Sequence, residues 1–262
     1  MLRFERLEND VDELRRRFSN AQPFQHIVID DFCEEEALLR LYDDIPDPVT
    51  HHINKSRDYI FARNKHEKSG FKDISPDFAQ LHADLMSERF QSLLQRITGE
   101  AVFVDPAFHG GGIHQGGEGS FLDMHVDFNT HPLHPDWFRN LNILVYLNKD
   151  WQPDFKGELK LRHRDRPETT LEVAPRFNRC VIMFTRDYTL HGYDAIRFPA
   201  GQYRRSLAAY AYSPMHETQL THRTTVWYPD NAGAAKTMIG RLWPSLVRVK
   251  SALFGSATAK NK

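Results

Sequence analysis

The spacing of apolar residues changes after Gly99, and this change constrains the fold more than any other feature. Before Gly99, apolar residues recur at steps of three and four, which is the spacing of one face of an amphipathic helix. From residue 101 to 212 they come in short continuous or alternating runs, which are typical of strands. The chain is therefore predicted to form helices first and strands second.

The segment before Gly99 is predicted to hold three helices and one strand. Residues 4–18 place their apolar side chains along one stripe, residues 24–32 are rich in β-branched and aromatic residues, and residues 34–44 are helical up to a pair of prolines. The strongest helix begins with serine and proline at 75 and 76 and ends at Gly99. The polar stretch 50–72 receives no assignment.

Short strand-like runs separated by Gly, Pro, Asn and Asp dominate the segment after Gly99. They favour an antiparallel jelly roll, so the predicted class is α+β with a mainly β core, a double-stranded β-helix supported by N-terminal helices. Residues 1–100 are interpreted as the support region, 101–228 as the jelly-roll core, and 229–262 as a basic extension. The runs are 101–104, 121–128, 141–147, 157–163, 170–173, 180–184 and 205–212.

Composition limits the classes of protein to which the chain can belong. With 262 residues and 40% apolar content it can bury a sizeable core in one main domain. A formal net charge of −1 offers no field that would attract nucleic acid, so no nucleic-acid partner is expected. Cys33 and Cys180 are too few for a disulfide framework. The charged residues 1–17 and the lack of a long apolar run predict a cytoplasmic protein without a transmembrane segment.

The C-terminal tail, residues 231–262, has six basic residues and no acidic one. Its apolar positions suit a basic helix interrupted at Pro244. Such a helix could contact a membrane surface or a partner. A packed or frayed extension is the favoured alternative, because such tails are common at domain ends.

A candidate metal site begins with His125 and Asp127 inside the β region. Because strand side chains alternate, residues two apart point to the same face. His191 follows the strand run 180–184, where the end of a neighbouring strand could bring it against this pair. Two imidazoles and one carboxylate leave three open positions on a metal, the arrangement that non-haem Fe(II) oxygenases use.

Arg205, fourteen residues past the second histidine, opens the last strand run of the β region. A guanidinium on an otherwise small and apolar face needs an anionic partner, and a carboxylate would suit it. Arg204 is the alternative, but alternation favours Arg205. The residues expected to share the face of Arg205 are Leu207, Ala209 and Ala211.

The order of HxD, distal histidine and arginine resembles the 2-oxoglutarate/Fe(II) oxygenase superfamily, specifically its prolyl-4-hydroxylase-like branch, over residues 102–212. Residues 146–151, YLNKDW, resemble the segment after the HxD in the hypoxia-sensing prolyl hydroxylases. The resemblance implies that Tyr146 and Arg205 hold the distal carboxylate of 2-oxoglutarate. It also implies Fe(II), 2-oxoglutarate and O₂ as cofactors, with ascorbate as an optional reductant. The implied metal ligands are His125, Asp127 and His191.

Three further residues are candidates for the pocket. Gln115 stands where these relatives use a tyrosine near the co-substrate, so it could donate a hydrogen bond there. Asn142 shares the strand face of Tyr146, although an ordinary structural hydrogen bond is the favoured role. Among the remaining histidines, His114 is the one most expected to line the pocket. The loop 128–137 is a candidate lid or substrate wall.

The resemblance implies hydroxylation of an unactivated C–H bond, with release of succinate and CO₂. The substrate would be an amino acid, a peptidyl (prolyl-like) group or a small metabolite. One alternative is a His₂Asp zinc hydrolase, which would have no use for Arg205. Another is a non-catalytic jelly-roll binding protein with the basic tail as its working part, which would have no reason to keep a charged cluster inside an apolar barrel.

Overall fold

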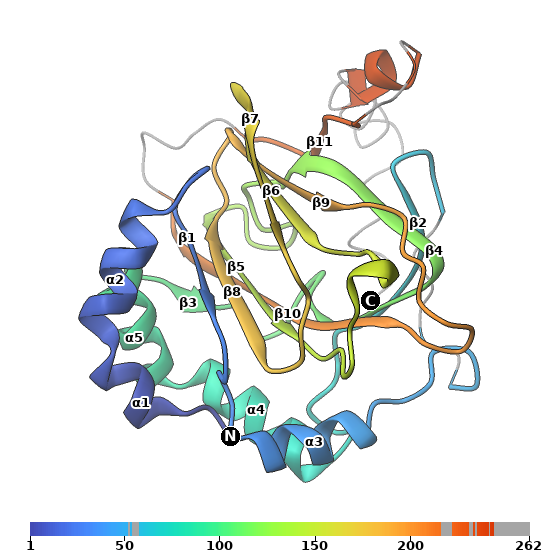
Figure 1. Ribbon diagram of the computed structural model, residues 1–262. Coiled ribbons are helices and arrows are strands. Elements are labelled where there is room, and N and C mark those ends of the chain that lie inside the picture. Colours follow the sequence, from blue (N-terminus) through green and yellow to red (C-terminus); the bar gives the residue numbers. More distant parts are fainter. Residues whose placement is uncertain are drawn as a thin grey trace.

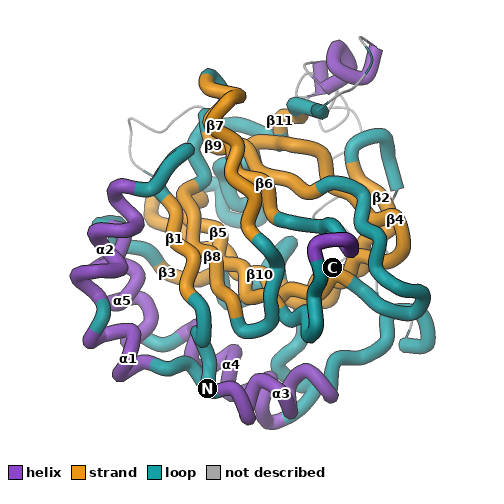
Figure 2. Tube along the Cα trace, viewed as in Figure 1, coloured by secondary structure: helices purple, strands orange, loops and turns teal. Residues whose placement is uncertain are grey.

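A curled β-sheet forms the centre of the structure, and helices cover one part of its outer surface (Figures 1 and 2). Its inner face surrounds a cavity, and its outer face packs on the helices. This arrangement confirms the predicted mainly β, jelly-roll class. The computed structural model describes residues 1–51, 53, 58–215, 222–230, 233, 235–240 and 242–243.

The helices that the hydrophobic stripes predicted are present, but two of them are broken. Asp10 separates α1 from α2, and Ser87 separates α4 from α5. The backbone of Ser87 is extended, and its hydroxyl accepts a hydrogen bond from the amide of Phe90, so it caps a new helix. The single helix expected up to Gly99 is therefore wrong. The helices are α1 Phe4–Asn9, α2 Val11–Asn20, α3 Glu35–Asp43, α4 Pro76–Met86 and α5 Glu88–Thr98.

The strands run in the order β1-β8-β5-β10-β4-β9-β6-β7 across the sheet, and each neighbouring pair is antiparallel. β2 and β11 also pair with the long strand β4, and β3 pairs with β10. A 3-10 turn at Pro153–Phe155 precedes β6. The strands are β1 His26–Ile29, β2 Ala62–Lys68, β3 Phe103–Val104, β4 Gly112–Val126, β5 Trp137–Tyr146, β6 Leu159–His163, β7 Arg166–Val173, β8 Arg179–Phe184, β9 Thr189–Tyr193, β10 Arg204–Pro214 and β11 Val226–Trp227.

Glycines allow β2, β4 and β10 to approach one another closely. β4 begins inside residues 110–119, a stretch rich in glycine, and β2 lies within residues 50–72, for which the sequence predicted no structure. A Cβ atom on Gly111 would lie 2.6 Å from the carbonyl oxygen of Ala208, and one on Gly112 would collide with the carbonyl oxygen of Lys68. Glycine at these two positions therefore permits a backbone approach that a side chain would block.

The two faces of β5 and β10 separate the main core from the cavity. One face supplies apolar side chains that pack with the helices, and the alternate residues point to the inner side of the sheet. Figure 1 shows α1, α2 and α5 beside β1 and β3 on the outer side of the sheet. The core residues of the two strands include Leu141, Ile143, Val145, Leu207, Ala209 and Ala211.

The predicted basic tail lies mostly outside the described residues, and the proposed division into three regions remains a prediction. Residues 235–240 are helical, and the ammonium of Lys236 lies 2.7 Å from the carboxylate of Asp123 on β4. None of the described helices is long and apolar enough to cross a membrane.

Replacing Leu141 by Ala should lower the free energy of unfolding by roughly 2–5 kcal/mol, because it empties space in a fully buried part of the core. Leu133 is 51% exposed, so Leu133→Ala should change it by less than about 0.5 kcal/mol. Urea denaturation of both variants measures the difference. Equal effects would contradict the placement of the core.

Candidate active site

His125 on β4 and His191 on β9 lie directly opposite each other in the strand register. Their ring centroids are 4.2 Å apart. The structure thus brings together two histidines that are 66 positions apart in the sequence, as the sequence predicted, by pairing the strands that carry them. Both side chains are buried at the inner side of the sheet.

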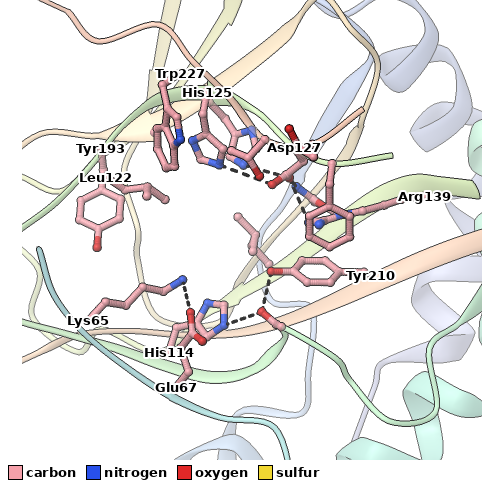
Figure 3. Close-up of a pocket in the computed structure, with 18 of the residues that line it drawn as sticks. Lys65, Glu67, His114, Leu122, His125, Asp127, Arg139, Tyr193, Tyr210 and Trp227 are labelled. Carbon is pink, nitrogen blue, oxygen red and sulfur yellow. Dashed lines mark hydrogen bonds and ion pairs between the residues drawn. The ribbon is translucent and has the colours of Figure 1, made fainter. Parts of the chain in front are cut away.

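Asp127 completes a three-residue cluster one residue after the end of β4. Its Oδ1 lies 3.5 Å from His125 Nε2, and its Oδ2 lies 3.4 Å from His191 Nε2. One ligand atom from each of the three residues falls within 4.8 Å of the others. Figure 3 shows His125 and Asp127 side by side. Two imidazole nitrogens and one carboxylate oxygen at this spacing fit a divalent transition metal.

The hydrogen bond of His125 assigns its tautomer. Nδ1 lies 2.9 Å from the carbonyl oxygen of Asp123, which can only accept, so Nδ1 carries the proton. Nε2 then presents a lone pair toward Asp127 and His191. A backbone carbonyl that orients an imidazole in this way is typical of metal-binding histidines.

Arg139 and Asn142 fix the carboxylate of Asp127. Arg139 Nη2 and Asn142 Nδ2 donate to its Oδ2 at 3.0 and 2.7 Å. The guanidinium of Arg139 is 1% exposed and lies 3.5 Å from the ring centroid of Tyr210. Arg139 was not predicted as a site residue, because its only signal in the sequence is a charge just before an apolar strand run. A register irregularity between β5 and β10 adjoins it and changes the alternation there.

Burial and neighbouring charges shift the pKa values of this cluster. Burial alone would raise the pKa of Asp127, but Arg139, followed by His191 and His125, holds that pKa well below its usual range. Burial, followed by the nearby His125, lowers the pKa of His191 to about 3. Asp127 is therefore ionised and His191 neutral at physiological pH, which are the forms that bind a metal.

A cavity of about 690 Å³ opens in front of the cluster. Figure 3 shows Lys65, Glu67 and His114 on the wall across from His125 and Asp127. Lys65 Nζ and Glu67 Oε1 are 2.9 Å apart, and both side chains are mostly buried. His114 lines the cavity as expected. The loop after Asp127 contributes Phe128, Thr130, His131, Pro132 and Pro135 to the wall.

Arg204, and not Arg205, faces this cavity. Arg204 is 7% exposed, its Nη2 lies 3.3 Å from Tyr146 Oη, and its Nε donates to the carbonyl oxygen of Gly157 at 2.7 Å. Arg205 points to the other side, where its Nε donates to Gln115 Oε1 at 3.0 Å. The residues of β10 alternate as predicted, but the apolar face that carries Leu207 packs in the main core and does not line the cavity. The expectation that Arg205 faces the pocket is therefore wrong, and Arg204 is the arginine of β10 that lines the cavity.

Gln115 also lies outside the cavity, contrary to its predicted role. Its Nε2 donates to the carbonyl oxygen of Pro46 at 2.9 Å. β4 changes its register with β9 between Leu122 and His125. Residues before this irregularity, Gln115 among them, therefore point to the opposite face from the one that simple alternation from His125 predicts. Asn142 and Tyr146 do line the cavity, as their shared strand face predicted.

Residues 111–212 match the family model described as the 2OG-Fe(II) oxygenase superfamily. The matched region carries the histidine–aspartate–histidine cluster and Arg204. The core of this chain is a 2OG-Fe(II) oxygenase domain. Oxygenases of this superfamily require Fe(II), 2-oxoglutarate and O₂, so the chain is a 2-oxoglutarate-dependent dioxygenase, and neither the zinc hydrolase nor the scaffold reading is favoured.

Solved structures of prolyl hydroxylases share the fold of this oxygenase. A Trichoplax adhaerens prolyl hydroxylase, in complex with a hypoxia inducible factor peptide fragment, has a TM-score of 0.59 at 14% identity, covering 79% of this chain and 91% of that chain. A Pseudomonas putida prolyl-4-hydroxylase has a TM-score of 0.55 at 15% identity, covering 77% and 98%. A Phytophthora capsici prolyl 4-hydroxylase has a TM-score of 0.56 at 16% identity, covering 97% and 80%. No curated protein sequence matches the chain significantly.

The depressed pKa of His191 predicts a pH-dependent stability of the chelator-treated oxygenase. Between about pH 6.5 and pH 5 the unfolded chain protonates this histidine and the folded chain does not. The free energy of unfolding should therefore fall as the pH is lowered, by up to about 1.4 kcal/mol per pH unit from this one group. Asp127 stays ionised in the folded and the unfolded chain over this pH range, so it does not contribute to the pH dependence of the free energy of unfolding.

Urea denaturation of wild type and His191→Gln at several pH values measures this contribution. The free energy of unfolding of His191→Gln should depend less steeply on pH than that of wild type, because the variant lacks this histidine. His51→Gln, at an exposed position, should keep the wild-type slope. Identical slopes in wild type and His191→Gln would show that the histidine is not held neutral in the folded protein.

Proposed function

We propose that this oxygenase holds Fe(II) through His125, Asp127 and His191 and hydroxylates an unactivated C–H bond of its substrate. The observation that carries the proposal is the convergence of three ligand atoms within 4.8 Å at one side of the cavity. When bound, the iron uses O₂ and 2-oxoglutarate to place one oxygen atom in the C–H bond and the other in succinate, with loss of CO₂. Protein side chains bind and orient the reactants.

Arg139 and Asn142 act as positioning residues in this proposal. They fix one oxygen of Asp127 by two hydrogen bonds, so the carboxylate cannot rotate freely. The carbonyl of Asp123 orients His125 in the same manner. A ligand set held in place by such contacts needs little rearrangement when the metal enters.

Arg204 and Tyr146 are proposed to bind the distal carboxylate of 2-oxoglutarate. Arg204 is buried, lines the cavity and forms no ion pair with a described residue. A buried guanidinium without an anion is costly, and a planar carboxylate is its best partner. The hydroxyl of Tyr146, next to the guanidinium, offers a second hydrogen bond.

The substrate is proposed to be an amino acid, a peptidyl group such as a prolyl side chain, or a small metabolite. The fold shared with the Trichoplax adhaerens enzyme, whose structure includes a peptide fragment, supports the peptidyl candidate. Ascorbate is proposed as an optional reductant. A cytoplasmic location is also proposed, and it agrees with the two buried free cysteines.

His125→Ala should abolish iron binding and turnover, because it removes one of three proposed ligands. Two measurements test this: the weak visible band of the anaerobic Fe(II)–2-oxoglutarate complex, and succinate production after O₂ is added. His134→Ala, at an exposed position outside the cluster, is the matched control and should retain both signals. A full visible band in His125→Ala would remove this histidine from the ligand set.

Arg204→Gln should raise the KM for 2-oxoglutarate roughly 10- to 100-fold, because it removes a charge-assisted carboxylate contact. Arg205→Gln is a closely matched control on the opposite face of the same strand and should change this KM little. Succinate formation at varied 2-oxoglutarate concentration measures both. The reverse ranking of the two variants would restore the role to Arg205.

A further inference from the structure

The described wall of the cavity has more positive than negative charges. The four cations and two anions leave an excess of two positive charges. The charges of Fe(II) and of the 2-oxoglutarate dianion cancel, so this excess remains in the loaded oxygenase. A cavity with such a field favours a negatively charged ligand. The cations are Lys65, Arg139, Arg204 and Arg223, and the anions are Glu67 and Asp127.

Three of the four cations have an assigned partner. Lys65 pairs with Glu67 at 2.9 Å, and Arg139 pairs with Asp127 at 3.0 Å. Arg204 is assigned to the co-substrate under the proposed function. Arg223 forms no ion pair with any residue that the structure describes.

Arg223 is held beside the metal cluster by its backbone and by one side-chain nitrogen. Its amide donates to Asn129 Oδ1 at 2.7 Å, and its Nε donates to the backbone oxygen of Asp127 at 3.0 Å. Its Nη2 is buried and has no hydrogen-bond partner among the described residues. A buried donor without a partner costs about 1–3 kcal/mol, and more when it is charged. The guanidinium is therefore anchored through Nε, while its Nη2 lacks an acceptor among the described residues.

Two residues that follow Arg223 in the sequence also have a buried polar atom that lacks a hydrogen-bond partner within the described ranges. Thr224 Oγ1 and Trp227 Nε1 are also buried without a hydrogen-bond partner in the described part of the chain. All three side chains line the cavity, and the ring of Trp227 lies 4.9 Å from the ring of His125 (Figure 3). A guanidinium and an indole N–H can only donate, and a hydroxyl can also donate. This wall is thus suited to a ligand that presents acceptor oxygens.

We propose that Arg223, Thr224 and Trp227, here called the donor wall, bind an anionic group of the substrate, a carboxylate or another oxyanion. The proposal rests on the proposed function for the identity of the site and narrows the substrate class to acids. The distal carboxylate of 2-oxoglutarate is not this group, because it is assigned to Arg204 and Tyr146 on β10 and β5.

Titration of simple oxyanions into the anaerobic enzyme loaded with Fe(II) and 2-oxoglutarate tests the donor wall. Sulfate and acetate are the probes, and sodium chloride at matched ionic strength is the blank. The visible band of the complex and the tryptophan fluorescence report binding next to His125 and Trp227. Wild type should show a saturable change with at least one of the two oxyanions, and the tighter one distinguishes a tetrahedral oxyanion from a carboxylate.

Arg223→Gln should weaken this binding at least about tenfold, which corresponds to the loss of one charge-assisted contact. Arg223→Lys keeps the charge and should recover part of the affinity. Thr224→Val should weaken binding severalfold without lowering the melting temperature, because it removes only an unpartnered hydroxyl. Arg16→Gln, at an exposed arginine far from the cavity in sequence and paired with Glu13, should bind the oxyanion as wild type does.

The outcomes separate this proposal from the proposed function. The donor-wall proposal is overturned if wild type shows no saturable change with either oxyanion. It is also overturned if wild type, Arg223→Gln and Thr224→Val bind the oxyanion with equal affinity. In both cases a normal visible band shows that the iron site itself is intact. Failure of wild type to form the visible band contradicts the iron site itself. A lowered melting temperature of Thr224→Val with unchanged affinity assigns the wall a structural role and also overturns the proposal.

Discussion

The register between β4 and β9 is the constraint on which the active site depends, because it sets His125 opposite His191. A slip of one residue would turn one imidazole to the other face of the sheet and separate the ligands. Several strands oppose such a slip. β4 pairs with β2, β10 and β11 as well as with β9: β10 pairs with residues 112–116, β2 with residues between 113 and 122, and β11 with residues 125 and 126. Asp127 follows directly after β4, so its position depends on the same register.

The fold and the metal cluster could be predicted from the sequence because each depends on short-range alternation. The change of period at Gly99 separates helices from strands, and the two-residue spacing of His125 and Asp127 survives in the structure as a shared direction. Alternation also predicted that Asn142 and Tyr146 would lie together in the cavity. The second histidine was predicted from its position after the strand run 180–184, and the pairing of β4 with β9 confirms that a neighbouring strand brings it against the pair.

Two predictions were wrong because alternation shows which residues share a face of a strand but not which of the two faces points to the cavity. β10 illustrates this, because its apolar face looks like the lining of a barrel and packs on helices instead, so Arg204 took the place of Arg205. Gln115 was misplaced by an irregularity in β4 that no local pattern announces. Arg223 could not be found at all, since its segment shows no period and meets the site only through contacts with residues more than 90 positions earlier.

The contact between Arg139 and Asp127 has a consequence for how readily the oxygenase acquires and loses its metal. The buried guanidinium of Arg139 keeps the carboxylate of Asp127 ionised and fixes its orientation, so the ligand set is in place before a cation binds. The same guanidinium repels that cation through a poorly screened interior. The contact between Arg139 and Asp127 therefore has two opposite effects on metal affinity: it fixes the carboxylate in advance, and it adds a positive charge beside the bound cation.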